Sequence, residues 1–259
     1  MLSTLFIMLQ AATPASAQPL PTLNEVQFTE CLDLARKDAP SAVTEASLWT
    51  QQNGGYLALA CHGFALATDF KFDLAAPILT EAAKGAEEKR DARATRFWAQ
   101  AGNAALANDQ PADGLSALDR ALAVAAAATE KADIEVDRAR ALVALHRSDE
   151  AVTALASART LEPENGTAWL LSATLARRVG KLPDALAYVQ TAAALLPREP
   201  AVALEAGNIA IAAGDEAAAR KQWEQVIAIA PSSRQANTAQ AQLAALGPSS
   251  TPASEPQSR

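Results

Sequence analysis

The residues that most often carry catalytic and metal-binding chemistry are scarce in this sequence. Its 259 residues include two histidines and two cysteines, and neither His62 nor His146 stands at a ligand spacing such as HExxH. Glycine-rich phosphate loops, dinucleotide motifs and the G-x-S-x-G nucleophile motif are missing as well. These absences predict that the protein binds no metal, uses no cofactor and is not an enzyme. Abundant acidic residues leave open a catalytic pair that only the fold would bring together.

Excess positive charge, long apolar runs and aromatic residues are lacking too. Lysine and arginine total 22 against 29 acidic residues, a net charge of −7, which argues against nucleic acid as the main partner. No stretch reaches the roughly 18–20 apolar residues of a membrane-spanning helix. Half of the residues are hydrophobic but only 5% are aromatic. Much of the apolar share is alanine and leucine, which favour helices that approach closely.

The N-terminus has the pattern of an export signal. Residues 1–17 contain a short apolar core, Leu2–Leu9, and end in Ala15-Ser16-Ala17, the small-x-small pattern of a signal-peptidase site. No lysine or arginine precedes the core. We interpret residues 1–17 as a signal peptide cleaved after Ala17, which makes the mature protein periplasmic or secreted. The alternative is a disordered or anchoring N-terminus.

Alanine and proline recur with a fixed period in the second half of the chain. The recurring positions, 34 residues apart, are Ala151, Ala185 and Ala219, and Pro163, Pro197 and Pro231. Apolar residues at i, i+4 and i+7, as in Ala151, Leu155 and Ala158, share one face of a helix. The following proline ends that helix, because it lacks an N–H and clashes with the preceding turn. A fixed period of this length predicts a repeat array.

The first half of each period carries a second pattern. It reads Trp98-x2-Ala101-Gly102-x2-Ala105 in one unit and Trp169-x2-Ser172-Ala173-x2-Ala176 in another. With the alanine, large residue and proline that follow, the chain resembles the tetratricopeptide repeat family. The resemblance implies an all-α, right-handed superhelix of about five helix-turn-helix units. The matching units are 56–89, 95–128, 132–165, 166–199 and 200–233.

The same resemblance divides the rest of the chain. An array needs atypical end units, because its last faces have no neighbour to bury them. The expected segments are a signal peptide (1–17), a linker (18–24), an N-terminal capping helix pair (25–55), the array (56–233), a C-terminal capping helix (234–247) and a disordered tail (248–259). Within the second unit, the alanine-rich run Ala121–Ala128 is expected to lie in a helix. Trp98, Trp169 and Trp223 occupy core positions of the repeat.

The resemblance also places the binding surface on the concave side, which the first helix of each pair lines. The residue after the small position faces this groove in each unit. These residues are Phe64, Asn103, Arg140, Thr174 and Asn208. In peptide-binding members an asparagine here bonds a peptide backbone, because its amide both donates and accepts. Arg177, one turn further on, offers a fork for a carboxylate.

The candidate binding residues are therefore Gln100, Asn103, Arg140, Arg177 and Asn208. The resemblance implies a non-enzymatic scaffold of the cell envelope that binds a protein or peptide in its concave groove. These residues are alternatively ordinary solvated side chains. Two other classes stay open: a structural adaptor held by its convex face or its ends, and an enzyme or small-ligand binder.

Cys31 and Cys61 lie 30 residues apart, close to one helix-pair period. First helices of neighbouring pairs pack side by side, so residues one period apart face each other. An oxidising compartment favours a disulfide between them, provided that their Cα atoms lie about 4.4–6.8 Å apart. The alternative is two small buried hydrophobic side chains that never pair.

Overall fold

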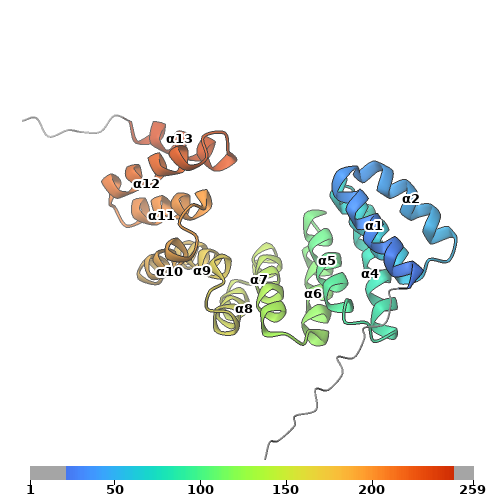
Figure 1. The fold of residues 1–259 in the computed structure, drawn as a ribbon. Coiled ribbons are helices and arrows are strands. Elements are labelled where there is room, and N and C mark those ends of the chain that lie inside the picture. Colours follow the sequence, from blue (N-terminus) through green and yellow to red (C-terminus); the bar gives the residue numbers. More distant parts are fainter. Residues whose placement is uncertain (1–21, 248–259) are drawn as a thin grey trace, which may run out of the picture.

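The computed structural model describes residues 22–247, which form thirteen helices and no strand (Figure 1). The helices are α1 (Leu23–Lys37), α2 (Ala39–Gln51), α3 (Gly55–Thr68), α4 (Phe72–Glu88), α5 (Ala94–Ala107), α6 (Pro111–Val124), α7 (Ala128–Ala144), α8 (Ser148–Leu161), α9 (Gly166–Arg178), α10 (Leu182–Leu195), α11 (Pro200–Ala212), α12 (Glu216–Ile229) and α13 (Arg234–Leu246). The all-α prediction is confirmed. The predicted signal peptide and C-terminal tail lie outside the described residues.

The helices stack as pairs into a curved array. Each helix from α2 to α13 packs against the one before it, and α5, α7, α9 and α11 also contact one another in succession. Figure 1 shows the array as an arch, with α7 and α9 on its inner side and α8 and α10 on its outer side. The first helices of these pairs therefore line the concave side, as the repeat resemblance implies.

Five helix pairs close through a three-residue turn whose middle residue has a positive φ. These residues are Phe70, Asp109, His146, Gly180 and Gly214, with φ between 56° and 84°. Glycine adopts this conformation without strain, whereas a bulky side chain rarely does. Phe70 is therefore the unusual member of the set.

Small residues let the two helices of a pair approach closely. A Cβ on Gly207 of α11 would lie 2.4 Å from the Nε1 atom of Trp223 in α12. A Cβ on Gly102 of α5 would lie 2.7 Å from the Cγ atom of Leu118 in α6. Trp98 and Trp223 are buried, as predicted for core positions. Trp169 is only partly buried, because its ring lies on the surface of α9 against Tyr188.

The alanine-rich run at the end of the second unit is not one helix, which corrects the expectation from sequence. Helix α6 ends at Val124, and α7 begins at Ala128. Ala125 has extended backbone (φ −66°, ψ 133°) and a buried side chain. Helix propensity is a weak influence that packing overrides, and here Ala125 packs into the core while the chain turns between the two pairs.

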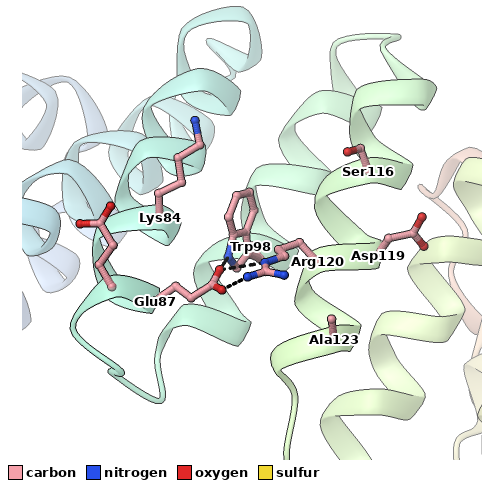
Figure 2. Close-up of a pocket in the computed structure, with 8 residues that line it drawn as sticks. Lys84, Glu87, Trp98, Ser116, Asp119, Arg120 and Ala123 are labelled. Atoms are coloured by element: carbon pink, nitrogen blue, oxygen red, sulfur yellow. Dashed lines mark hydrogen bonds and ion pairs between the residues drawn. The ribbon is translucent and has the colours of Figure 1, made fainter.

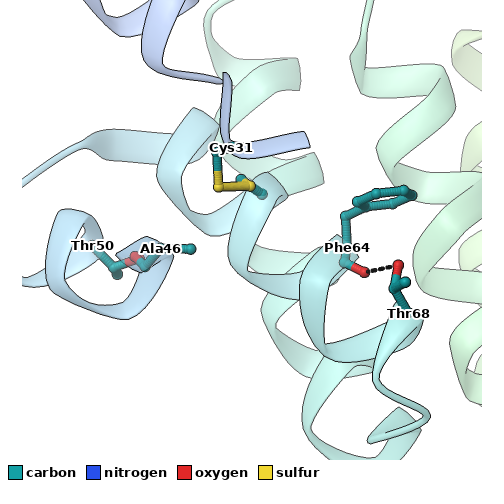
Figure 3. The surroundings of a disulfide bond; sticks show 6 residues. Cys31, Ala46, Thr50, Phe64 and Thr68 are labelled. Carbon is teal, nitrogen blue, oxygen red and sulfur yellow. Dashed lines mark hydrogen bonds between the residues drawn. A yellow bond between two sulfur atoms is a disulfide. The ribbon is translucent and has the colours of Figure 1, made fainter. Parts of the chain in front are cut away.

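The N-terminal pair is fastened to the array by a disulfide between α1 and α3 (Figure 3). Cys31 and Cys61 are joined with a Cα–Cα distance of 6.2 Å, as the sequence predicted, and both are buried. Phe28 of α1 also packs edge-on against Phe97 of α5, with 6.0 Å between ring centroids. Helix α1 thus contacts two successive units.

An ionic cluster reinforces the same attachment. Arg93, at the start of α5, pairs with Asp91 at 2.5 Å and with Glu25 of α1 at 3.2 Å. The Tyr56 hydroxyl donates to Asp91 at 2.6 Å. The hydrogen bonds from Arg93 and Tyr56 lower the pKa of Asp91 to about 2, against the opposing effect of burial.

Candidate binding groove on the concave side

A cleft of about 230 Å³ lies between α7 and α9, with α8 beneath it. Its lining residues are Ala139, Arg140, Val143, Leu155, Leu171, Thr174, Leu175 and Arg178. Arg140 and Thr174 are two of the residues that the repeat pattern places on the groove side. The cleft therefore lies on the inner side of the arch, where the first helices of two successive pairs meet.

The floor of this cleft is apolar and its rim is basic. Leu155 and Leu175 are buried and belong to the main core, while Leu171 packs against that core from the side. Ala139 is the small residue of its unit, which leaves room above Leu155. The guanidinium groups of Arg140 and Arg178 are exposed at the rim. Such a cleft suits an apolar side chain that has a carboxylate beside it.

Arg140 is held by its neighbours on α7 and α5. It forms an ion pair with Asp137, and the other oxygen of Asp137 accepts a hydrogen bond of 2.7 Å from the Asn103 amide. The structure thus connects two of the predicted groove residues through an aspartate that the sequence did not single out. The Asn103 amide oxygen remains on the exposed face of α5 and can accept a hydrogen bond.

Arg178 differs from Arg140 because no acidic side chain of residues 22–247 forms an ion pair with it. The repeat pattern instead predicted its neighbour Arg177 as a groove residue. Arg177 donates to Glu205 of α11 through Nε at 2.6 Å and through Nη2 at 3.2 Å, and Glu205 is only 6% exposed. The fork of Arg177 is therefore closed inside the array, and Arg178 is the arginine that faces the cleft.

Arg177 and Arg178 follow Thr174 by three and four residues, so either arginine could lie on the same helix face as Thr174. The signal that separates them is Glu205, a lone acid in the apolar helix α11, which needs a buried partner. Gln100 and Asn208 lie partly exposed on α5 and α11 and do not line the cleft. Phe64 lies outside it as well, under the guanidinium of Arg36 at 5.9 Å.

A second, wider cleft of about 720 Å³ opens between α4 and α6 (Figure 2). Glu87 spans it, accepting a 3.0 Å hydrogen bond from the Trp98 indole and forming an ion pair with Arg120. The hydrogen bond from Arg120 lowers the pKa of Glu87. The charges at its centre already satisfy one another, so this cleft has less to offer a ligand than the one between α7 and α9.

Residues 22–247 show no group of three histidine, cysteine or acidic side chains that could hold a metal ion. The same residues include no helix that is both long and apolar enough to cross a membrane.

Comparison with known proteins gives a family match for part of the chain. Residues 136–200 and 170–236 match the family model for the tetratricopeptide repeat. These overlapping matches show tetratricopeptide repeats over residues 136–236. No curated protein sequence matches the chain.

Several solved structures share the fold. PilW, a widely conserved type IV pilus biogenesis factor, superposes with a TM-score of 0.69 at 18% identity, over 85% of this chain and 99% of PilW. PilF of Pseudomonas aeruginosa gives 0.64 at 14% identity, over 85% and 99%. YrrB, described as a tetratricopeptide repeat protein with an unusual peptide-binding site, gives 0.51 at 17% identity, over 83% and 97%. At these identities the likeness establishes the fold alone.

Proposed function

We propose that this protein is a non-enzymatic scaffold that binds a segment of a partner protein in its concave groove, centred on the cleft between α7 and α9. The observation that carries the proposal is the combination in one cleft of an apolar floor with two exposed arginines. Water hydrates the two arginines, but contact of the apolar floor with water is unfavourable. A partner segment that buries an apolar side chain there gains hydrophobic free energy in proportion to the area covered.

The chemistry of the rim narrows the class of segment. Arg178 has no acidic partner within the described residues, and Arg140 shares only one aspartate. A carboxylate between the two guanidinium groups completes both sets of hydrogen bonds, and charge-assisted bonds of this kind are the stronger ones. We therefore infer a segment in which an aromatic or aliphatic residue stands next to aspartate, glutamate or a C-terminal carboxylate. The Asn103 amide oxygen and the Thr174 hydroxyl can bond its backbone.

The test begins with a phage-displayed library of random peptides, selected on the full-length protein. We expect the enriched sequences to combine a large apolar residue with an adjacent acid. A synthetic peptide from this set should bind the double variant Arg140→Glu/Arg178→Glu about a hundredfold more weakly than the unaltered chain, because a charge pair becomes a repulsion at two points.

The matched control is Lys221→Glu/Arg234→Glu, which makes the same charge change at exposed positions of α12 and α13, outside the cleft. It should leave the affinity for that peptide unchanged. Equal weakening by the control and the double variant would mean that net charge, and not the cleft, decides binding. Selected peptides without acidic residues would also contradict the proposal.

Export is a further element of the proposal. The residues that form the signal lie outside the described residues, but the disulfide between Cys31 and Cys61 supports an oxidising compartment. Mass spectrometry of protein purified from its native cells should give Gln18 as the first residue. A cytosolic protein that retains Met1 would contradict export.

The adaptor alternative is favoured by one observation, the wide cleft between α4 and α6 on the other side of the array. Exchanging Glu87 for lysine should abolish partner capture if that face carries the function. It should leave capture unchanged if the concave groove does.

A further inference from the structure

The turn between α3 and α4 presents an aromatic side chain to solvent in a strained conformation. Phe70 has φ 59° and is 81% exposed. At the corresponding turn of the other four units stand Asp109, His146, Gly180 and Gly214, which are polar or tolerate positive φ. A bulky residue in this conformation is an outlier, and strain of this kind gathers at functional sites.

Neighbouring side chains support the exposed ring of Phe70, which forms a knob on the surface of the turn. The Phe72 ring supports it edge-on, with 6.1 Å between ring centroids, and Leu74 in the first turn of α4 is half exposed. Acidic residues flank the aromatic ring in the sequence on both sides. Asp69 pairs with Lys71 at 2.8 Å, and Asp73 is exposed at the start of α4. The turn thus combines an apolar tip with carboxylates beside it.

The same chain carries the complement of this knob. The cleft between α7 and α9 has an apolar floor and the exposed guanidinium groups of Arg140 and Arg178 at its rim. Two helices of the second unit, α5 and α6, separate α4 from α7 along the array. Figure 1 shows α4 and α9 in different arms of the arch. The Phe70 side chain, in the turn just before α4, therefore reaches this cleft only in another molecule.

We propose that the protein associates head to tail, with the Phe70 turn of one copy seated in the α7–α9 cleft of a second copy. Asp73 then faces Arg140 and Arg178. This inference rests on the proposed function, because the acceptor is the same cleft. Since donor and acceptor are different surfaces, the contact is heterologous and repeats along a growing chain of molecules. A partner segment in the groove displaces the neighbouring copy, so partner binding and self-association compete.

The experiment uses the full-length protein and measures its mass by sedimentation velocity over a hundredfold range of concentration. The unaltered chain should rise from one-chain mass to larger species as concentration increases, and added salt should reduce the effect, since the charges lie at an exposed rim. Phe70→Asn removes the aromatic side chain, and asparagine tolerates the positive φ of this position. Arg140→Glu/Arg178→Glu removes the acceptor. Each variant should remain a monomer.

Mixing the two variants gives the sharpest readout. The acceptor variant retains its Phe70 and the knob variant retains its cleft, so an equimolar mixture should form a one-to-one dimer that grows no further. The control Lys221→Glu/Arg234→Glu should associate like the unaltered chain. Three results overturn the inference: an unaltered chain that stays monomeric throughout, a Phe70→Asn variant that still associates, or a mixture that stays monomeric.

Peptide binding separates this inference from the proposed function. Phe70→Asn leaves the cleft intact and should bind the phage-selected peptide as tightly as the unaltered chain. If it does so while the unaltered chain never associates, the self-association is wrong and the groove function stands. If Arg140→Glu/Arg178→Glu binds that peptide as tightly as the unaltered chain, the groove function fails. The mixture experiment still decides the association on its own.

Discussion

Helices α1–α8 and helices α9–α13 are held together in different ways. In the N-terminal region most buried apolar residues belong to one continuous core, which runs from Phe28 to Leu155 and ends on Leu175 of α9. Two small clusters, around Ala42 and Val136, lie beside it. A disulfide and the ionic cluster around Arg93 fasten its first helix. In the C-terminal region the buried residues fall into separate clusters, one around Val189 and another around Trp223.

The more regular part of the sequence has the less continuous core. The family match covers residues 136–236, where the 34-residue period is strict, and the core becomes divided within this stretch, beyond α8. A regular array gains stability from each unit and from each contact between neighbours, and not from a shared core. The candidate cleft lies where the continuous core ends, so a segment bound there contacts both kinds of structure. The C-terminal units should therefore open without the N-terminal region.

The largest expected effect comes from paired truncations that test this independence. Leu118 on Gly102 and Trp223 on Gly207 occupy the same position in two units, and both are buried. Trp223→Ala should cost about 3–5 kcal/mol and give a separate early unfolding step for α11–α13 in urea. Leu118→Ala should cost about 2–5 kcal/mol and shift the main transition as one step. If both variants unfold in one identical transition, the C-terminal units do not unfold independently of the N-terminal region.

The second effect concerns the disulfide. Cys31→Ala/Cys61→Ala should lower the free energy of unfolding by about 3–4 kcal/mol, because the bridge closes a loop of 30 residues in the unfolded chain. The loss should fall on the transition of the N-terminal region, followed by circular dichroism in urea, and leave the C-terminal step in place. Reduction of the unaltered protein is the control and should reproduce the result. No change on reduction would show that the bridge does not form.

A smaller effect is expected from pH. The pKa of Asp91 is about 2 in the folded protein, below the value of roughly 3.9 of an unperturbed aspartate. Its contribution to stability is therefore complete above about pH 4 and is lost as the pH falls towards 2. Thermal melting of the unaltered chain and of Asp91→Asn should differ at pH 7 and converge near pH 2. A difference that persists at pH 2 would contradict this account.

The smallest effect is a gain. Phe70→Asn should relieve the strain of a positive φ, worth about 1–2 kcal/mol for an L-residue, but it gives up the contact with Phe72, worth about 0.5–1.5 kcal/mol. We expect a net stabilisation of roughly 0.5 kcal/mol, measured by urea unfolding at a concentration where the chain is monomeric. Phe72→Leu is the companion variant, and it should destabilise the chain slightly. A clear loss of stability in Phe70→Asn would mean that Phe70 serves packing.

The helix pairs and the disulfide could be predicted from sequence because they depend on period and residue type. The positions of Ala151, Ala185 and Ala219 fix the register of the second helices, and each of them is fully buried. The choice between Arg177 and Arg178 could not be made, because one residue rotates a side chain by about 100° on a helix. Only the placement of Glu205 in the next unit decides it.

Contacts between units escaped prediction for a similar reason. Asn103 and Asp137 lie 34 residues apart and meet across α5 and α7, but many residue pairs share that spacing. The exposure of Phe70 was also hidden, because a phenylalanine beside a helix usually belongs to the core. Turn geometry, not composition, turns this side chain outward.

The central claim is that the cleft between α7 and α9 is the binding site. Hydrogen-exchange mass spectrometry of the full-length protein, with and without the phage-selected peptide, tests it most directly. Binding should slow exchange in α7 and α9, on both sides of the boundary between the two core types, and leave α4 and α6 unchanged. Protection confined to α4 and α6, or no protection in α7 and α9 at saturating peptide, would contradict the claim.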